Sequence, residues 1–327
     1  MTSRERVKLV INNKIPDRLP FNFWMDRDKM SELDEQLGEN FRITHYGADV
    51  VETFPGLPFF AEFAVNAEVV FDGKTFWTKK YAVESVAELE NAPMFDPDNP
   101  ALYDYIKVDR VKYPDKALFA LMVTPLDILL NYVGMEQLFV DIGEYGELIE
   151  QLCEKMSQVQ LRSIDHIADS DMDVLYLAGD ICSTKGSLLS PDMLRKFFFN
   201  PVKKLIGRAH EKGLKVFYHT DGHVMDILPL FVEYGFDGIN PLQANAGNNI
   251  YEFVEKYGDK LMVYGGMDNC FTIPQGSTED VRHHVKELFE VLGKNGRFII
   301  SSHDIPSSVP MENIDVMVET IKSCKYN

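Results

Sequence analysis

The sequence of 327 residues is poor in cysteine and tryptophan, with four and two residues respectively. The cysteines, Cys153, Cys182, Cys270 and Cys324, lie far apart and form no Cys-x-x-Cys pair. A chain of this length with so few, scattered cysteines does not depend on a disulfide framework. We therefore expect a cytoplasmic protein.

Positive charge and long apolar runs are also scarce. Lys and Arg number 33 against 51 Asp and Glu, so the formal net charge is −18 at pH 7. This balance argues against a nucleic-acid partner, whose phosphates would be repelled. No apolar run approaches the roughly 20 residues that span a bilayer, and no hydrophobic segment of a signal peptide follows the N-terminus. We expect neither membrane insertion nor secretion.

No Gly-x-Gly-x-x-Gly motif follows the first strand candidate, which counts against a doubly wound sheet. What the sequence does contain is a series of short apolar runs that mostly alternate with amphipathic helical patterns. The eight runs lie at residues 19–24, 48–53, 117–123, 173–178, 214–218, 236–240, 260–266 and 297–302. Eight strand candidates in this arrangement favour a single-domain (β/α)8 TIM barrel over residues 1–327, with the doubly wound sheet as the alternative.

Two local patterns add detail to this barrel. Residues 59–100 interrupt the alternation, and residues 69–78 predict a β-hairpin about an Asp72-Gly73 turn. We interpret this segment as an insertion on the barrel and not as a separate domain. Further along, Ser190 followed by Pro191 predicts the start of a helix, because serine caps a free amide and proline suits the first helical position.

Polar side chains follow the strand candidates. In a barrel of this kind the active site lies at the C-terminal ends of the strands. The residues at these ends are Asp26, Glu52, Thr124, Asp180, His219 with Asp221, Asn240 with Gln243, Asp268 with Asn269 and Cys270, and His303 with Asp304. We expect these side chains to surround one site.

His219 and Asp221 form the centre of that expected site. They are two residues apart, so they face the same side if the strand stays extended. His303, from another strand, would complete a set of two imidazoles and one carboxylate. Such a set with an open position suits catalytic zinc or, alternatively, ferrous iron, and Cys270 could join or replace a ligand. The competing interpretation is that these polar groups only satisfy one another at the barrel mouth.

Two further carboxylates are candidates for catalysis. Asp180 follows a buried strand and could act as a general acid or base if its surroundings shift its pKa, or it could cap amides of the next loop. Asp268 follows two glycines, which permit close approach of a ligand, so we favour a functional role for it.

An ordered series of motifs resembles the uroporphyrinogen decarboxylase superfamily, most strongly between residues 172 and 315. The motifs are Gly179-Asp180 with residues 188–193, then residues 217–222, residues 227–229, residues 235–243, residues 265–268, and residues 302–306 with residues 309–313. The family fold is a (β/α)8 barrel, which agrees with the strand count. The resemblance implies one of two activities.

The first implied activity is cofactor-free decarboxylation. True decarboxylases carry an Arg-Gln-Ala-Gly-Arg-Tyr motif after the first strand, but residues 23–30 here read Phe-Trp-Met-Asp-Arg-Asp-Lys-Met. Only Arg27 could stand in for the arginines that bind the substrate's carboxylates, and a polycarboxylate needs those charge-assisted hydrogen bonds. Decarboxylation of a porphyrinogen or a smaller acid, using Asp26, Arg27 and Asp180, is therefore the second hypothesis.

The other implied activity is that of the corrinoid-linked methyltransferases. This branch binds zinc through a histidine, a cysteine two residues later and a second cysteine near the end of the barrel. His219 matches the first ligand, Asp221 stands at the first cysteine, and His303 lies about where the second would be. Two histidines and an aspartate form a harder site, which suits polarisation of an oxygen or nitrogen substituent.

The leading hypothesis is a methyltransferase that moves a methyl group from a small O- or N-methylated compound to a corrinoid. The chain lacks the Asp-x-His-x-x-Gly pattern of corrinoid-binding domains, so we expect the corrinoid on a partner protein. A non-catalytic ligand-binding barrel is a third hypothesis, and a homodimer is compatible with the sequence. The assigned residues are His219, Asp221, His303 and Cys270 for a divalent metal, with zinc preferred, Asp180, Asp268 and Asp26 for catalysis, and Asn240, Gln243 and Arg27 for substrate binding.

Overall fold

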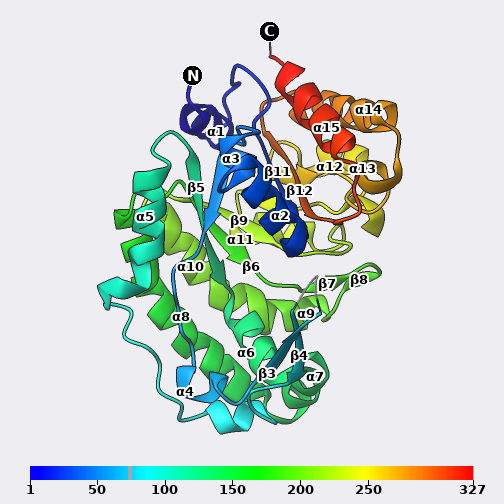
Figure 1. The fold of residues 1–327 in the computed structure, drawn as a ribbon. Coiled ribbons are helices and arrows are strands. Elements are labelled where there is room, and N and C mark those ends of the chain that lie inside the picture. The colour runs from blue at the N-terminus through cyan, green and yellow to red at the C-terminus, as the bar shows by residue number, and fades with distance from the viewer. Residues whose placement is uncertain (73–75, 327) are drawn as a thin grey trace.

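An eight-stranded parallel sheet forms the centre of the computed structural model, which describes residues 1–72 and 76–326 (Figure 1). Its strand order is β1-β12-β11-β10-β9-β6-β5-β2. The strands are β1 (Phe21–Met25), β2 (Val50–Thr53), β5 (Ala117–Val123), β6 (Val174–Ala178), β9 (Lys215–His219), β10 (Gly238–Asn240), β11 (Met262–Gly266) and β12 (Phe298–Ile305). Each overlaps one of the eight predicted strands, and β12 continues beyond the predicted end to Ile305.

The two edge strands of this sheet, β1 and β2, come together and nearly close it into a barrel. The amide of Asp49, which precedes β2, donates a hydrogen bond of 2.8 Å to the carbonyl of Phe21 in β1. All ladders between neighbouring barrel strands are parallel. The predicted (β/α)8 TIM barrel is therefore confirmed.

Helices surround the barrel, and α8 packs against α10 while α14 packs against α15 (Figure 1). None of the described helices is both long and apolar enough to cross a lipid bilayer. The α-helices are α1 (Ser3–Ile11), α2 (Arg27–Leu37), α3 (Phe41–Thr44), α4 (Ala61–Ala64), α5 (Asp104–Lys112), α6 (Pro125–Val133), α7 (Met135–Glu144), α8 (Gly146–Asp169), α9 (Pro191–Leu194), α10 (Asn200–Glu211), α11 (Leu228–Tyr234), α12 (Ile250–Tyr257), α13 (Thr272–Gln275), α14 (Thr278–Leu288) and α15 (Met311–Ser323). Shorter 3₁₀ and π segments are η1 (Val86–Leu89), η2 (Pro100–Tyr103), η3 (Arg195–Phe199), η4 (Ala244–Ala246) and η5 (Phe289–Gly293).

The predicted hairpin of the insertion is present as the antiparallel pair β3 (Glu68–Phe71) and β4 (Phe76–Lys80). Gly73 of its predicted turn lies outside the described residues. A second, two-residue hairpin, β7 (Cys182–Ser183) with β8 (Gly186–Ser187), is not predicted from the sequence. The helix start at Ser190 is confirmed, since its hydroxyl accepts a hydrogen bond from the Met193 amide.

Aromatic side chains fill the interior of the barrel. The ring of Phe119 lies 5.4–6.4 Å from the rings of Tyr176, Phe217 and Tyr264, in edge-to-face geometry. Apolar residues of α1 close this core at the N-terminal end of the strands, with Val7 and Val10 fully buried. Interior positions of a barrel of this kind are packed with side chains, so the space for a ligand is left at the C-terminal end.

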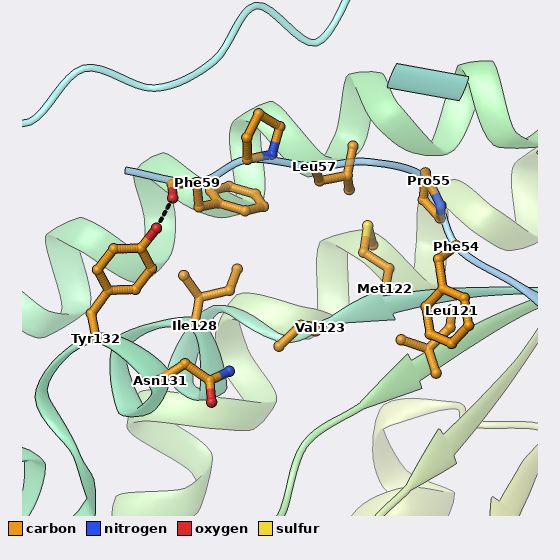
Figure 2. A pocket seen from close by; sticks show the side chains of 11 residues that line it. Phe54, Pro55, Leu57, Phe59, Leu121, Met122, Val123, Ile128, Asn131 and Tyr132 are labelled. Carbon is orange, nitrogen blue, oxygen red and sulfur yellow. Dashed lines mark hydrogen bonds between the residues drawn. The ribbon is translucent and has the colours of Figure 1, made fainter. Parts of the chain in front are cut away.

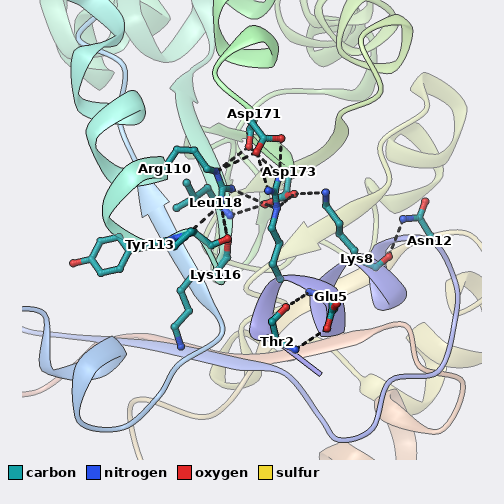
Figure 3. A network of polar contacts seen from close by, with 12 residues as sticks. Thr2, Glu5, Lys8, Asn12, Arg110, Tyr113, Lys116, Leu118, Asp171 and Asp173 are labelled. Atoms are coloured by element: carbon teal, nitrogen blue, oxygen red, sulfur yellow. Dashed lines mark hydrogen bonds and ion pairs between the residues drawn. The ribbon is translucent and has the colours of Figure 1, made fainter.

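A network of ion pairs ties α1 to the N-terminal end of the barrel (Figure 3). The carboxylate of Asp173 is fully buried and lies 2.9 Å from Nε of Arg4 and 3.0 Å from Nη2 of Arg110. Nζ of Lys8 is 3.3 Å away, and the amide of Leu118 donates a hydrogen bond of 3.0 Å to the same carboxylate. A buried charge with this many partners is stable only as long as the set is complete.

We expect Asp173→Ala to lower the free energy of unfolding by about 3–5 kcal/mol, because it leaves two arginines without their buried partner. Glu39→Ala is the matched control, since Glu39 forms an exposed pair with Lys112 and should change stability by less than about 1 kcal/mol. Urea titration of both variants measures the difference. Equal effects would show that the Asp173 network does not hold the N-terminal end together.

Candidate active site

A cavity of about 250 Å³ opens at the C-terminal ends of the strands. It is lined by Trp24, Met25, Glu52, Phe54, Leu121, Tyr176, His219, Asn240, Ser301, Ser302, His303 and Asp304. These residues come from seven of the eight barrel strands or from the residues that follow them, with β11 as the exception. Of the residues predicted at strand ends, Glu52, His219, Asn240, His303 and Asp304 line this cavity.

The orientation of His219 is set by Asn240, its register partner on the neighbouring strand. The Asn240 amide nitrogen donates to the Tyr264 carbonyl at 2.5 Å, so Oδ1 of Asn240 faces the opposite way. That oxygen accepts hydrogen bonds of 2.6 Å from both His219 Nδ1 and the Tyr176 hydroxyl. Since Nδ1 of His219 must carry the proton in this arrangement, the lone pair of the imidazole is on Nε2, where a metal could bind.

Asp221 and Asp180 come together beside His219. Ligand atoms of the three residues lie within 4.8 Å of one another, and the amide of Asp221 donates to Oδ1 of Asp180 at 2.9 Å. Gly222 permits this turn: its φ is +96°, and a Cβ there would lie 2.5 Å from the Ser183 carbonyl oxygen. The loop after β9 passes so close to the backbone of Ser183 that this position requires glycine.

His303, from the last strand, is not one of these three residues but contacts one of them, Asp221. Its Nε2 lies 2.9 Å from Oδ1 of Asp221. A β-bulge on β12 sets two residues, His303 and Asp304, opposite the single Trp24 of β1, and bulges commonly re-aim side chains next to active sites. Asp304 has a φ of +46° at this bulge.

The charges of Asp221 and His303 reinforce each other. Burial by itself would lower the pKa of His303, but the Asp221 carboxylate outweighs burial and raises this pKa above its ordinary value. Burial by itself would raise the pKa of Asp221, yet His303 and His219 hold it below its ordinary value. The carboxylate is therefore present as an anion near neutral pH, as a metal ligand must be.

The donor set fits a divalent metal ion. In the described part of the chain, Nδ1 of His303 and Oδ1 of Asp221 are buried and receive no hydrogen bond, and the contact between Asp221 and His303 is an ion pair without hydrogen-bond alignment. Buried polar atoms without a hydrogen-bond partner are rare in proteins, so a bound ion or another ligand is expected beside them. Ligand atoms about 2 Å from a central ion lie at most about 4 Å apart. The ligand atoms of Asp180, His219 and Asp221 lie within 4.8 Å of one another, so these three would need to approach by less than about 1 Å.

Cys270 and Asp268 lie in a different local setting. Within the described residues, Cys270 is not part of the cluster that joins Asp180, His219 and Asp221. Its Sγ accepts a hydrogen bond of 2.9 Å from Asn245. The Asp268 carboxylate accepts from the amides of Cys270, Phe271 and Thr272 at 3.0–3.1 Å and so caps α13. Burial opposes ionisation of Asp268, but these amides keep its pKa below the ordinary value.

Asp26 and Gln243 form hydrogen bonds with other parts of the chain, and Arg27 lies at the surface. Oδ2 of Asp26 accepts hydrogen bonds from the amide and hydroxyl of Ser307, which joins the end of β1 to the loop after β12. Oε1 of Gln243 accepts a hydrogen bond of 2.6 Å from the Gly222 amide. Arg27 is exposed on the first turn of α2. Catalytic and substrate-binding roles for these residues stay predictions.

Asp127, to which no role is assigned from the sequence, holds the loop that carries Asp180. Its carboxylate accepts from the Asp180 amide at 2.9 Å and from the Thr124 hydroxyl at 2.6 Å. A Cβ on Gly179 would lie 1.8 Å from this carboxylate, so no side chain fits there. The Thr-x-x-Asp spacing at the start of a helix is a sequence signal that could have pointed to Asp127.

Glu52 is a second site residue whose role is not predicted beyond its place at a strand end. It accepts hydrogen bonds from the Tyr264 hydroxyl and, at 3.4 Å, from Asn22. Burial raises the pKa of Glu52 above its ordinary value, although the bond from Tyr264 opposes this. The charge of Arg42, whose guanidinium lies 3.5 Å from the centre of the Trp24 ring, also opposes this rise without cancelling it. Glu52 is therefore a carboxyl group that retains its proton at higher pH than usual.

We expect Asp127→Asn to remove a pH dependence of stability. Burial raises the pKa of Asp127 to about 7. Because the folded protein then holds a proton that the unfolded chain loses near pH 4, wild-type stability should fall as pH rises from about 4 to about 7, by about 2–4 kcal/mol. The asparagine variant does not titrate, and its Oδ1 can still accept from the Asp180 amide while its Nδ2 donates to the Thr124 hydroxyl, so urea titrations at pH 5 and pH 8 should differ less for it. The exposed Asp259→Asn is the control, and an unchanged pH dependence in Asp127→Asn would contradict the prediction.

Comparison with solved structures relates this fold to known barrels. A methyltransferase from Methanosarcina mazei is similar over 99% of both chains, with 18% sequence identity and a TM-score of 0.76. A 3-keto-L-gulonate-6-phosphate decarboxylase from Vibrio cholerae matches over 94% of this chain and 100% of its own, with 10% identity and a TM-score of 0.37. The first similarity shows a shared fold along the whole chain, and the second is too weak to support an argument. No curated protein matches this sequence.

A family model gives the direct assignment. The uroporphyrinogen decarboxylase (URO-D) model matches residues 21–324, from the first residue of β1 to just beyond α15. Because this match covers nearly the whole barrel, the chain belongs to the uroporphyrinogen decarboxylase family.

Proposed function

We propose that this protein is a metal-dependent methyltransferase that takes a methyl group from a small O- or N-methylated compound and passes it to a corrinoid carried by a partner protein. The observation that carries the proposal is the ligand cluster at the barrel mouth, where His219 has its Nε2 lone pair free beside the Asp221 carboxylate and His303. Family membership and the fold shared with the Methanosarcina mazei methyltransferase support it.

The metal site of the proposal consists of His219, Asp221 and His303, with the Asp180 carboxylate in reach of the first two. A divalent ion bound there, with zinc preferred, would act as a Lewis acid toward the oxygen or nitrogen atom of the methyl donor. Asn240 supports this role because it holds the His219 ring in one tautomer and one orientation. Outer partners of this kind raise the basicity of a metal-bound histidine.

Glu52 is the proton donor of the proposal. When the methyl group leaves, its bonding electron pair stays on the donor's oxygen or nitrogen, which then takes up a proton. Glu52 lines the same cavity as His219, and because burial raises its pKa, it keeps its proton at higher pH than an ordinary glutamic acid. A general acid works best when its pKa is close to the working pH.

The decarboxylase alternative has less support in the geometry. Among the described residues, neither Lys nor Arg lines this cavity, and Arg27 is exposed on α2. A polycarboxylate substrate would meet the carboxyl groups of Glu52 and Asp304, and the His303 imidazole that also lines the cavity is already paired with Asp221, which disfavours binding electrostatically. No specific contact favours a binding protein without catalysis over an enzyme.

Elemental analysis and methyl transfer to reduced cobalamin test the proposal together. Protein purified without chelator should contain about one equivalent of metal per chain, and His219→Ala should lose both the metal and at least about 10²-fold of the transfer rate, because a ligand is gone. Cys270→Ala, which the cluster does not include, should keep both. Exposed His283→Ala is the histidine control.

Two results would contradict the metal assignment: protein without stoichiometric metal, or His219→Ala with full activity. Metal loss in Cys270→Ala equal to that in His219→Ala would instead move the site toward the cysteine. Turnover of uroporphyrinogen by metal-free protein would favour the decarboxylase.

We expect Glu52→Gln to lower kcat about 10²-fold while the metal content stays unchanged, because the amide keeps an acceptor for Tyr264 but has no acidic proton. The basic limb of the pH–rate profile should disappear in this variant. Glu62→Gln, on the exposed surface of α4, is the control. A wild-type profile in Glu52→Gln would rule out Glu52 as the proton donor.

A further inference from the structure

A second cavity of about 250 Å³ lies next to the active-site cavity (Figure 2). Its roof is the strap, residues 54–59, which follows β2. Its floor is formed by the end of β5 and the first turns of α6, including Val123 and Ile128 (Figure 2). Nothing in the proposed methyl transfer uses this space.

The lining of the second cavity is almost entirely apolar. Among the described residues that line it, none is charged, and Asn131 offers the one side-chain amide. The Tyr132 hydroxyl is already used, since it donates to the Phe59 carbonyl. The rings of Phe54 and Phe59 and the thioether of Met122 face the space (Figure 2). Aromatic edges and thioethers of this kind bind aromatic rings well.

The two cavities meet at a shared boundary. Phe54 and Leu121 line both of them. The side chain of Phe54 is 51% exposed, and Leu121 is partly buried on β5. A molecule that crosses this boundary would have one end among apolar side chains and the other beside His219.

The strap is held in place without a ligand. The Gly56 amide donates a hydrogen bond of 2.7 Å to the Leu102 carbonyl, and Tyr132 holds the Phe59 carbonyl. The ring of Phe59 packs edge-on against Phe95 at 4.8 Å. A roof fixed at both ends gives a cavity that exists before binding, which reduces the entropy lost on binding.

We propose that this second cavity binds the uncharged aromatic body of the methyl donor, so that the substrates are methylated aromatic compounds. This inference rests on the proposed methyl transfer and assigns its substrate class. The methyl-bearing atom crosses the boundary between Phe54 and Leu121 and faces the cluster of His219 and Asp221.

Size and charge both favour such an occupant. The cavity volume of about 250 Å³ exceeds the roughly 150 Å³ of an apolar cavity that accepts benzene. A carboxylate or ammonium group inside it would lose its hydration without gaining a charged partner. Methanol or a small methylated amine would leave most of the apolar surface wet, so such donors gain little from this cavity.

Calorimetric binding of methoxybenzene to the full-length protein tests the assignment. Leu57 lies in the strap and lines the cavity (Figure 2). Leu57→Asp therefore places a carboxylate where the methoxybenzene ring is proposed to bind. We expect this variant to bind methoxybenzene at least about tenfold more weakly than wild type, because the carboxylate is partly desolvated by the ring. Val65→Asp, at a residue 81% exposed just after α4 and outside the strap, is the control and should bind like wild type.

A second variant protects the test against loss of folding. Asn131 is exposed at the edge of the cavity, and Asn131→Asp adds a charge there without a change of shape. It should weaken methoxybenzene binding while its melting temperature stays at the wild-type value. Toluene, which has the ring without the oxygen, should compete with methoxybenzene in the wild-type protein.

The outcomes separate this inference from the proposed function. Methoxybenzene that binds in a Leu57-dependent way but does not give up its methyl group supports the aromatic site and counts against the methyltransferase. Transfer from methanol or tetramethylammonium with no binding of methoxybenzene overturns the aromatic site and leaves the methyltransferase in place. Equal affinity in Leu57→Asp and Val65→Asp also overturns the aromatic site.

Discussion

The hydroxyl groups of Tyr176 and Tyr264 connect the packed interior of the barrel to the site above it. Their rings belong to the aromatic core around Phe119, and their oxygens reach Asn240 and Glu52 at the floor of the cavity. Because the rings are fixed by dense packing, the polar groups they hold are fixed as well. The depth of the cavity and the orientation of the residues above it therefore depend on this one layer.

The electrostatics above that layer are dominated by acidic groups. Asp180 and Asp221 converge, and the described lining contains no Lys or Arg, so the site attracts positive charge. His303 compensates one carboxylate only. A divalent cation would neutralise this excess of negative charge, whereas an anionic substrate would add to it. The neighbouring cavity is lined without charged residues and favours apolar groups. Together the two cavities fit the proposed substrate, an elongated molecule with one polar end.

Residues at strand ends differ in how well their position could be predicted from the sequence. His219 and His303 line one cavity, as expected, because alternation along an extended strand determines which side chains face the barrel axis. The contacts of Asp268 were less predictable, since a carboxylate that precedes a short helix has backbone amides close at hand, and local sequence does not reveal which partner it takes. Asp127 lies in the first turn of α6, four residues after β5 ends, and becomes a site residue because Gly179 lets the Asp180 loop pass directly over it.

The sequence by itself determined the barrel, the order of its eight strands and the residues at their ends, because hydrophobic periodicity and turn residues are local properties of the chain. Only the tertiary structure decided which of those ends meet. The bulge that directs His303 toward Asp221, the tautomer that Asn240 imposes on His219 and the buried setting of Glu52 all arise from contacts between residues far apart in sequence. Such contacts depend on packing and local dielectric, which no single segment of the chain encodes.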